Sequence, residues 1–178
     1  VTMASAIELL HIATLVHDDT VDEAETRRGK ATVSNLWGNN IAVLFGDYVF
    51  ATSAIWVCET QNMRVIRRFS ETIMELAAGQ MSEFFSTYGR SRAKSEYEER
   101  IYRKTASLFS TAGETGAILG GSPESSIESL KDYGFNLGMA FQIMDDVLDF
   151  DGDAKQLGKP VGSDLWNGVL TLPGRLLI

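Results

Sequence analysis

The chain has 178 residues, of which 44% are hydrophobic and 22% are charged, and this balance is typical of a soluble globular protein with one core. The formal net charge of −8 at pH 7 disfavours nucleic acid as a partner. The single cysteine, Cys58, excludes an internal disulfide and is typical of a reducing compartment. We therefore expect a cytoplasmic protein in which Cys58 lies in the core.

Helical periodicity runs along nearly the whole chain, and no stretch shows sustained alternation of apolar and polar residues. We predict helices at about residues 2–23, 40–60, 62–87, 94–119, 123–151 and from 163 onward, with loops at 27–31, 88–93, 120–122 and 151–162. The pattern indicates an all-α fold with helices long enough to form a bundle. Because helical patterns reach both ends, we expect one domain over residues 1–178 that lacks the N- and C-terminal parts of a longer protein.

The segment Ile41–Cys58 is almost wholly apolar and could be mistaken for a membrane span. It is short for a bilayer, and Asp47 lies near its middle, where an acid costs about 2.5–3.5 kcal/mol on insertion scales. We therefore predict no transmembrane segment, and expect this helix to be buried on most sides in a core or a subunit interface.

One carboxylate pattern, Asp-Asp-x-x-Asp, occurs twice. The copies are Asp18, Asp19 and Asp22, and Asp145, Asp146 and Asp149. The first and last acids of each copy are four residues apart and share one helix face, where like charges repel each other. A hard cation such as Mg²⁺, bound together with phosphate, would compensate for this repulsion.

Each motif continues a polar stripe along its helix. The stripes are His11, Thr14, Asp18 and Asp22, and Gly138, Gln142, Asp145 and Asp149. Beside the second stripe runs an apolar repeat that predicts the core-facing side, composed of Ile127, Leu130, Gly134, Leu137, Phe141, Met144 and Leu148. Two helices that present such stripes to each other would form a pocket with acids at its rim.

Basic residues accompany both motifs. Arg27 and Arg28 follow the first, Lys159 follows the second, and Lys104-Thr105 interrupts a separate helix. Arginine binds phosphate oxygens in a bidentate manner, and lysine supplies a point charge. Singly these cations are ordinary helix-end residues, but together with the acids they indicate a diphosphate site.

Two other kinds of metal site match part of the sequence. Glu8 and His11 match the Glu-x-x-His of di-iron bundles, but the only other histidine, His17, has no glutamate three residues before it. His17-Asp18 could belong to a metal-dependent phosphohydrolase, but the chain offers no further histidines for such a site. We expect His17 to be a helix-surface or supporting residue.

Taken in order, the first acidic motif, Arg27-Arg28, Gly79-Gln80, Lys104-Thr105, Phe141-Gln142, the second acidic motif and Gly158-Lys159 resemble the trans-isoprenyl diphosphate synthases, also called polyprenyl synthetases. The resemblance is closest to long-chain, octaprenyl-type members and covers essentially the whole chain. It implies an isoprenoid-synthase-type helical bundle with a central cavity. It also implies a homodimer and three Mg²⁺ ions per active site.

The resemblance implies that isopentenyl diphosphate condenses with an allylic prenyl diphosphate through an allylic carbocation. The implied metal ligands are Asp18, Asp22 and Asp145, supported by Asp19, Asp146 and Asp149. The implied groups on the allylic diphosphate are Arg27, Lys104, Thr105, Gln142 and Lys159, and four of these, Lys104, Thr105, Gln142 and Lys159, are the implied catalytic set. Arg28 and His11 would contact isopentenyl diphosphate, and Gln80 would lie near the cation.

The length of the product depends on the size of the side chains one helical turn before the first acidic motif, because large ones would block the growing prenyl chain. Ala13 and Thr14 are small, whereas short-chain synthases of this type place aromatic residues there, so we predict a product well beyond farnesyl. The chain also departs from the family pattern, because Val169 occupies a position that is commonly lysine.

Two other functions are compatible with parts of this pattern. A non-catalytic subunit of a heteromeric synthase would tend to lose acids, and both motifs are intact here. A class I terpene cyclase would carry an Asn/Ser/Glu-type second metal motif in place of the second Asp-Asp-x-x-Asp.

Overall fold

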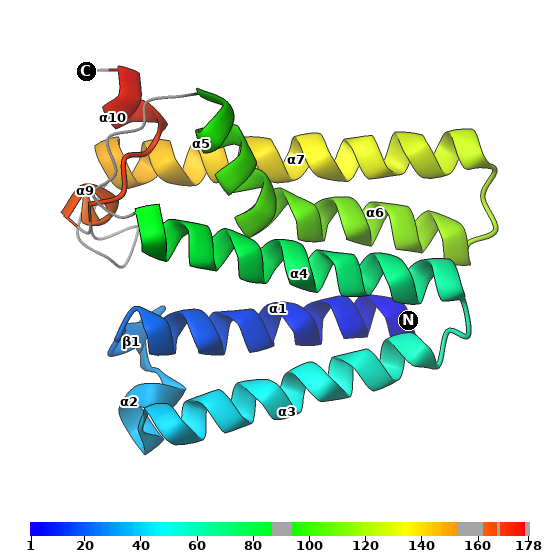
Figure 1. Ribbon diagram of the computed structural model, residues 1–178, viewed down its shortest axis with the longest axis horizontal. Coiled ribbons are helices and arrows are strands. Elements are labelled where there is room, and N and C mark those ends of the chain that lie inside the picture. The colour runs from blue at the N-terminus through cyan, green and yellow to red at the C-terminus, as the bar shows by residue number, and fades with distance from the viewer. Residues whose placement is uncertain (87–93, 153–161, 167, 177–178) are drawn as a thin grey trace. The chain divides into compact units, whose positions relative to one another are not determined.

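The computed structural model describes residues 1–86, 94–152, 162–166 and 168–176 (Figure 1). The chain divides into two compact units, Val1–Ile66 and Arg67–Ile178. We describe each unit by itself. The helical content of the chain confirms the predicted all-α class. That residues 1–178 form one domain stays a prediction.

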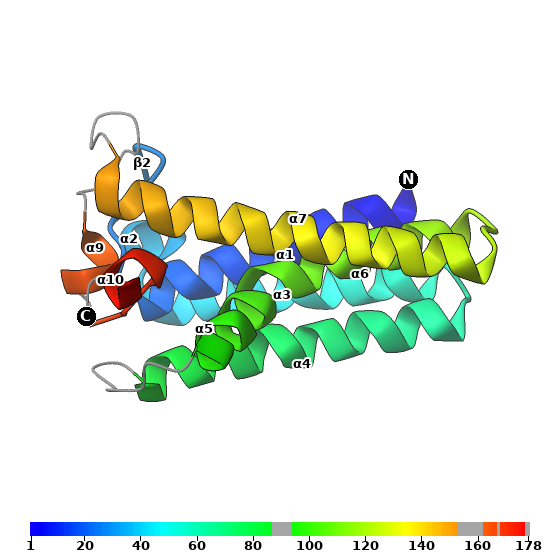
Figure 2. The same ribbon diagram turned by 90° about the horizontal axis from the view of Figure 1, so that it is seen from above.

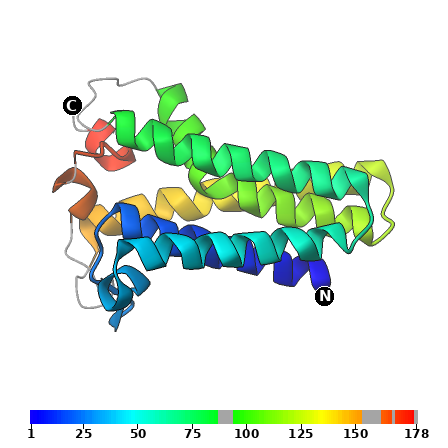
Figure 3. The same ribbon diagram turned by 60° about the horizontal axis from the view of Figure 1, so that its bottom comes forward.

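The first unit is built on two long helices, α1 (Thr2–Val21) and α3 (Asn39–Cys58), which lie side by side (Figures 1 and 3). Buried residues recur every three or four positions on both. They are Met3, Ala6, Leu10, Ala13, Val16 and Thr20 on α1, with Asp19 buried beside them, and Ala42, Gly46, Val49, Ser53 and Val57 on α3. This spacing gives each helix one stripe facing the other, and small side chains on α3 let the helices approach closely.

In the sequence, two short strands and a short helix connect α1 to α3. Strands β1 (Thr26–Arg27) and β2 (Lys30–Ala31) pair antiparallel, and α2 spans Val33–Trp37. Arg28 and Gly29 form the turn with φ values of 50° and 74°, as a two-residue hairpin loop of type I′ requires. The loop predicted at 27–31 is therefore wrong in detail, because part of it is a hairpin.

The second unit contains most of α4 (Met63–Ser86), α5 (Lys94–Ile101), the π-helix η1 (Tyr102–Ala106), α6 (Ser107–Leu119) and α7 (Glu124–Asp151). Figure 2 shows α6 running along α7. Two short helices follow, α9 (Ser163–Trp166) and α10 (Leu172–Leu176). The helix predicted at 94–119 is helical throughout, but residues Tyr102–Ala106 are π-helical and not α-helical. The helix predicted from residue 163 is α9, which is four residues long.

The predicted core-facing side of α7 is wrong for most of its residues. Ile127 and Gly134 are buried, but the other members of the apolar repeat are 42–57% exposed. Those exposed members are Leu130, Leu137, Phe141, Met144 and Leu148. The buried stripe instead includes Gly134, Gly138, Asp146 and Asp149. The two glycines allow α6 and η1 to approach α7, because an added Cβ would overlap the Phe109 carbonyl at Gly134 and Ala106 at Gly138.

Burial of α3 within the chain contradicts the core alternative expected for this helix, while the subunit-interface alternative stays a prediction. Within the described part of the chain, α3 is the helix long and apolar enough to cross a membrane by length and composition, and 22% of its most apolar window is buried. Its exposed apolar residues are Ile41, Val43, Leu44, Phe45, Tyr48 and Ile55. The side chain of Asp47 is 63% exposed, and Cys58 is exposed where a core position was predicted. In this chain α3 is a one-sided helix, because only the stripe facing α1 is covered.

Candidate functional site

The first acidic motif lies at the C-terminal end of α1. Asp18 is half-buried, Asp19 is buried at 7% exposure, and Asp22 is the exposed C-cap residue, whose backbone N–H donates to the Asp18 carbonyl at 2.8 Å. Asp18 and Asp22 are thus one turn apart on a solvent-accessible surface, as their spacing predicts.

The hairpin brings Arg27 back to this motif. Arg27 Nε donates to both carboxylate oxygens of Asp19, at 2.8 and 3.0 Å. The Asp19 side chain is 10% exposed and that of Arg27 is 40% exposed, so the pair lies at the edge of the unit. Arg28 is exposed in the turn. Asp19 and Arg27, which the sequence linked, are therefore neighbours in the fold.

Other predicted residues of the first stripe lie further along α1. Ala13 is fully buried, and Thr14 is half-buried with its hydroxyl donating to the His11 carbonyl at 2.8 Å. His11 is half-buried as well. Thr14 therefore occupies the more accessible of the two predicted chain-length positions.

His17 connects the motif to α3. Its Nε2 atom lies 3.4 Å from Asp47 Oδ1 and 3.3 Å from the Val43 carbonyl oxygen. The imidazole packs directly on Gly46, where an added Cβ would overlap the ring. His17 is thus a supporting residue between two helices, as expected.

In the second unit, three predicted residues form one hydrogen-bonded chain. Thr105 Oγ1 donates to Gln142 Oε1 at 2.6 Å, and Gln142 Nε2 donates to Asp146 Oδ1 at 2.9 Å. The hydroxyl of Tyr97 completes the chain by donating to Asp146 Oδ2 at 2.8 Å. Residues from η1, α7 and α5 are fixed relative to one another by these bonds.

Burial distinguishes the acids of the second motif. Asp146 and Asp149 are each 3% exposed, whereas Asp145 is half-buried. Burial raises the pKa of Asp146, and the hydrogen bonds from Gln142 and Tyr97 partly oppose that change. The pKa of Tyr97 is raised by burial and by its bond to Asp146, so its hydroxyl remains a donor.

The π-helix η1 carries Lys104 and Thr105. Lys104 Nζ binds Glu83 Oε2 of α4 at 2.7 Å. Gly79 permits this approach, because a Cβ there would lie 2.9 Å from Arg103 Cβ. Gln80 is half-buried on the same helix. Lys159 lies outside the described residues.

Sequence reasoning missed Tyr97, Glu83 and the π-helical geometry. The sequence did show that Lys104-Thr105 interrupts a helical pattern, and a π-helical turn is a form that such interruptions take, often at functional sites. Tyr97 lies in a strongly charged segment, 49 residues from Asp146, and nothing local indicates that pairing.

Both motifs offer oxygen ligands of the kind that Mg²⁺ prefers. Among the described residues, no group of three or more His, Cys, Asp or Glu side chains could hold a metal ion. Mg²⁺ is usually bound through one or two carboxylates together with substrate phosphates, so accessible acids such as Asp18, Asp22 and Asp145 fit that mode of binding.

Comparison with known proteins identifies a family and agrees with the fold. The family model described as polyprenyl synthetase matches residues 1–176. Heptaprenyl diphosphate synthase component 2 of Geobacillus stearothermophilus is 43% identical over 171 residues, which are 96% of this chain and 53% of that protein. The chain therefore belongs to the polyprenyl synthetase family, and it spans about half the length of the curated relatives it matches.

Two solved structures share the fold closely. Heptaprenyl diphosphate synthase from Staphylococcus aureus superimposes with a TM-score of 0.95 at 42% identity, covering 98% of this chain and 55% of that one. A polyprenyl synthase from Caulobacter crescentus, solved in complex with calcium and isoprenyl diphosphate, gives 0.92 at 39% identity, covering 98% and 53%. These matches support an isoprenoid-synthase-type helical fold for this chain.

Proposed function

We propose that the protein containing this chain is a prenyltransferase that condenses isopentenyl diphosphate with an allylic prenyl diphosphate to make a long-chain polyprenyl diphosphate. The observation that carries the proposal is the match of residues 1–176 to the polyprenyl synthetase family, with both acidic motifs and the Thr105–Gln142–Asp146 chain intact. In this proposal the two units belong to one synthase domain, and the protein acts in the cytoplasm, where the exposed thiol of Cys58 stays reduced.

Asp18, Asp22 and Asp145 are the proposed ligands of Mg²⁺, with three ions per site. Ions held by these acids would supply positive charge that neutralises the departing diphosphate. The Caulobacter relative was solved in complex with calcium and isoprenyl diphosphate, and the proposal that a divalent cation binds with this substrate class is consistent with that complex.

The other acids act through their partners in this proposal. Asp19 holds Arg27 by its Nε, which orients the guanidinium toward an allylic diphosphate. Asp146 holds the Gln142 amide, which in turn accepts the Thr105 hydroxyl. Asp149, buried at the base of the motif, supports the end of α7.

The remaining side chains bind substrates. Lys104, Thr105, Gln142 and Lys159 are the proposed catalytic contacts to the leaving diphosphate, together with Arg27. Arg28 and His11 bind isopentenyl diphosphate, and Gln80 lies near the carbocation. The allylic C–O bond breaks with its electron pair on diphosphate, the double bond of isopentenyl diphosphate attacks the cation, and loss of a proton restores a double bond.

We also propose that the protein is a homodimer that uses the exposed apolar face of α3. That face leaves five large apolar residues uncovered on one helix, Ile41, Leu44, Phe45, Tyr48 and Ile55, which is more than scattered surface exposure and is typical of an interaction site. Sedimentation of the full-length protein should give twice the monomer mass. A matched change of Leu44 and Tyr48 to lysine, which leaves the face toward α1 intact, should give the monomer.

The activity can be tested with the full-length protein, Mg²⁺, farnesyl diphosphate and labelled isopentenyl diphosphate. We expect the label in prenyl diphosphates longer than farnesyl and none after chelation of the metal. Absence of transfer would indicate a non-catalytic subunit, and a labelled or unlabelled hydrocarbon would indicate a cyclase. Either result would reject the proposal.

A further inference from the structure

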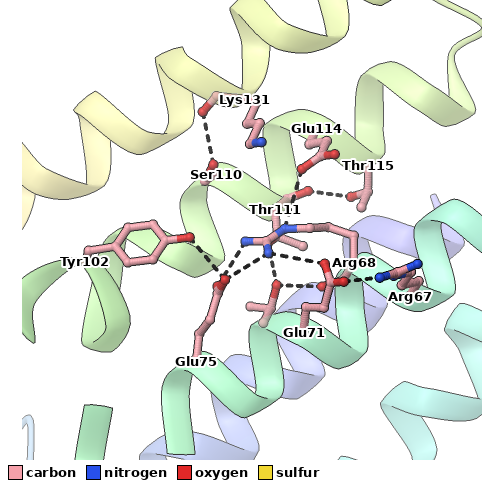
Figure 4. Close-up of polar contacts among 11 residues, drawn as sticks. Arg67, Arg68, Glu71, Glu75, Tyr102, Ser110, Thr111, Glu114, Thr115 and Lys131 are labelled. Atoms are coloured by element: carbon pink, nitrogen blue, oxygen red, sulfur yellow. Dashed lines mark hydrogen bonds and ion pairs between the residues drawn. The ribbon is translucent and has the colours of Figure 1, made fainter. Parts of the chain in front are cut away.

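A nearly buried arginine on α4 lies among three carboxylates, next to the π-helix (Figure 4). The Arg68 side chain is 11% exposed, and its two terminal nitrogens each lie 3.0 Å from one carboxylate oxygen of Glu75. Arg68 Nε lies 3.4 Å from Glu114 Oε2 of α6, and Arg68 Nη1 lies 3.8 Å from Glu71 Oε2. The bidentate bond to Glu75 fixes that carboxylate in one orientation.

Glu75 also binds the first residue of η1. Tyr102 Oη donates to Glu75 Oε1 at 3.2 Å, and the Tyr102 ring lies 5.7 Å from the ring of Phe135 on α7. Burial and then the negative charge of Glu75 raise the pKa of Tyr102, which keeps its hydroxyl protonated as a donor. The start of the π-helix is thus held by α4 through the hydroxyl and by α7 through the ring.

The position of this contact matters because of the geometry of a π-helix. A π-helical turn holds one residue more than an α-helical turn, so its loss would rotate the following residues by about 100° around the axis. Tyr102 is two residues before Lys104 and three before Thr105. A change of register would therefore remove Thr105 from Gln142 and Lys104 from Glu83.

Buried ion pairs are weak evidence for stability, because desolvation offsets much of their attraction. Buried ion pairs are better supported as a means of specifying one geometry. Any other arrangement of the side chains would leave a buried charge without a partner. Here the buried Arg68 fixes the orientation of the Glu75 carboxylate. The Glu75 carboxylate in turn fixes the position of the Tyr102 hydroxyl.

We propose that Glu75 and Tyr102 are positioning residues that hold the π-helical register of Tyr102–Ala106, and so place Lys104 and Thr105 for the allylic diphosphate. Arg68 acts one step further away, by orienting Glu75. The consequence for binding rests on the proposed prenyl transfer, whereas the consequence for the register does not.

The register is tested by hydrogen exchange of the amides of residues 102–106 in the full-length protein. Tyr102→Phe keeps the ring and removes the hydroxyl, and Glu75→Gln keeps the volume and removes the charge. Loss of a hydrogen bond to a charged group should speed exchange there by about tenfold in each variant. The control Arg67→Gln breaks the exposed Arg67–Glu71 pair on the same helix and should leave this exchange unchanged.

A double variant separates positioning from general loosening of the fold. If the hydroxyl acts through Glu75, Glu75→Gln with Tyr102→Phe should show no faster exchange than the stronger single variant. Additive effects, or unchanged exchange in Tyr102→Phe, would overturn the proposal. Should Glu75→Gln fail to fold, the exchange in Tyr102→Phe still decides the outcome.

Kinetics then test the link to the substrate. Tyr102→Phe should raise KM for the allylic diphosphate by about tenfold with a smaller change in KM for isopentenyl diphosphate. Equal changes for both substrates would reject the link. If the wild-type protein transfers no prenyl group, the proposed function fails while the exchange result still stands, so the two failures are distinguishable.

Discussion

The two copies of the acidic motif agree at their first and second positions and differ at the third. In both, the first aspartate is half-buried, and the second is buried and accepts hydrogen bonds from protein groups. Asp19 binds the edge guanidinium of Arg27, whereas Asp146 binds Tyr97 and Gln142 inside its unit. The third aspartate is exposed in the first copy and buried in the second. One sequence pattern thus places its acids in different environments, and we propose that these environments give the acids different roles.

The comparison predicts the largest effect at the first aspartates. Asp18→Asn and Asp145→Asn should each lower prenyl transfer by about 10²-fold to 10³-fold, because each removes charge at a position that we propose stabilises the leaving diphosphate. Initial rates with labelled isopentenyl diphosphate measure this. Asp132→Asn, at an exposed site on α7, is the matched control and should retain the wild-type rate. Near wild-type rates in both motif variants would remove these residues from the site.

The second aspartates should differ in stability. Asp146→Ala removes the acceptor of two donors and should lower the free energy of unfolding by about 2 to 3 kcal/mol. Asp19→Ala should cost about 1 kcal/mol or less, because its partner Arg27 is 40% exposed and is screened by solvent. Urea titrations followed by circular dichroism compare the two. The reverse order would contradict the assignment of inner and edge environments.

The contact between His17 and Gly46, next to the first motif, can be tested by substitution. Gly46→Ala should lower the free energy of unfolding by about 1 to 3 kcal/mol, since the added methyl overlaps the His17 ring. His17→Ala in the same chain should restore much of this loss by making room. Thermal unfolding of the single and double variants measures it, and a double variant no more stable than Gly46→Ala would exclude this overlap as the cause.

Product length tests the channel assigned to α1. Thr14→Phe places an aromatic ring one turn before Asp18 and should shorten the longest product, as judged by chromatography of the dephosphorylated prenols. Ala13→Phe addresses the same channel, but Ala13 is fully buried, so its unfolding free energy must be measured beside its products. An unchanged product distribution in Thr14→Phe would reject the channel.

The smallest effect is expected from pH. The raised pKa of Tyr102 means that the folded protein keeps a proton which the unfolded chain loses near pH 10. This contribution to stability is complete below about pH 10 and is lost as the pH rises through the folded-state pKa. Wild type should therefore lose more unfolding free energy above pH 10 than Tyr102→Phe. Identical alkaline slopes would mean that Tyr102 ionises normally.

The long helices could be predicted because their signals are local. Pro123 precedes α7 and Gly152 ends it, and the helices predicted at 2–23, 40–60 and 62–87 lie within about two residues of α1, α3 and α4. The hairpin around Arg28-Gly29 was missed because its strands have two residues each, too few to show alternation.

The contacts of the candidate site could be predicted only for residues that belong to the family motifs. Thr105, Gln142 and Asp146 are joined as a group that the family pattern had marked. By contrast, Tyr97 lies 49 residues from Asp146, and Glu75 lies 27 residues from Tyr102, so nothing local indicates either of these two pairings. The exposed face of α7 was mispredicted since hydrophobicity alone ranks Leu137 above Gly138. Close helix packing instead favours the residue with no side chain.

The division of roles within each motif is tested most directly by Mg²⁺-dependent binding of farnesyl thiodiphosphate, an unreactive allylic analogue, measured by calorimetry on the full-length protein. Asp145→Asn should weaken binding in Mg²⁺ by about tenfold or more and lose most of the difference between Mg²⁺ and chelator. Asp146→Asn, measured where it is fully folded, should keep that difference. Equal loss of Mg²⁺ dependence in both variants, or in neither, would contradict the assignment of the first aspartate to the metal and the second to the protein.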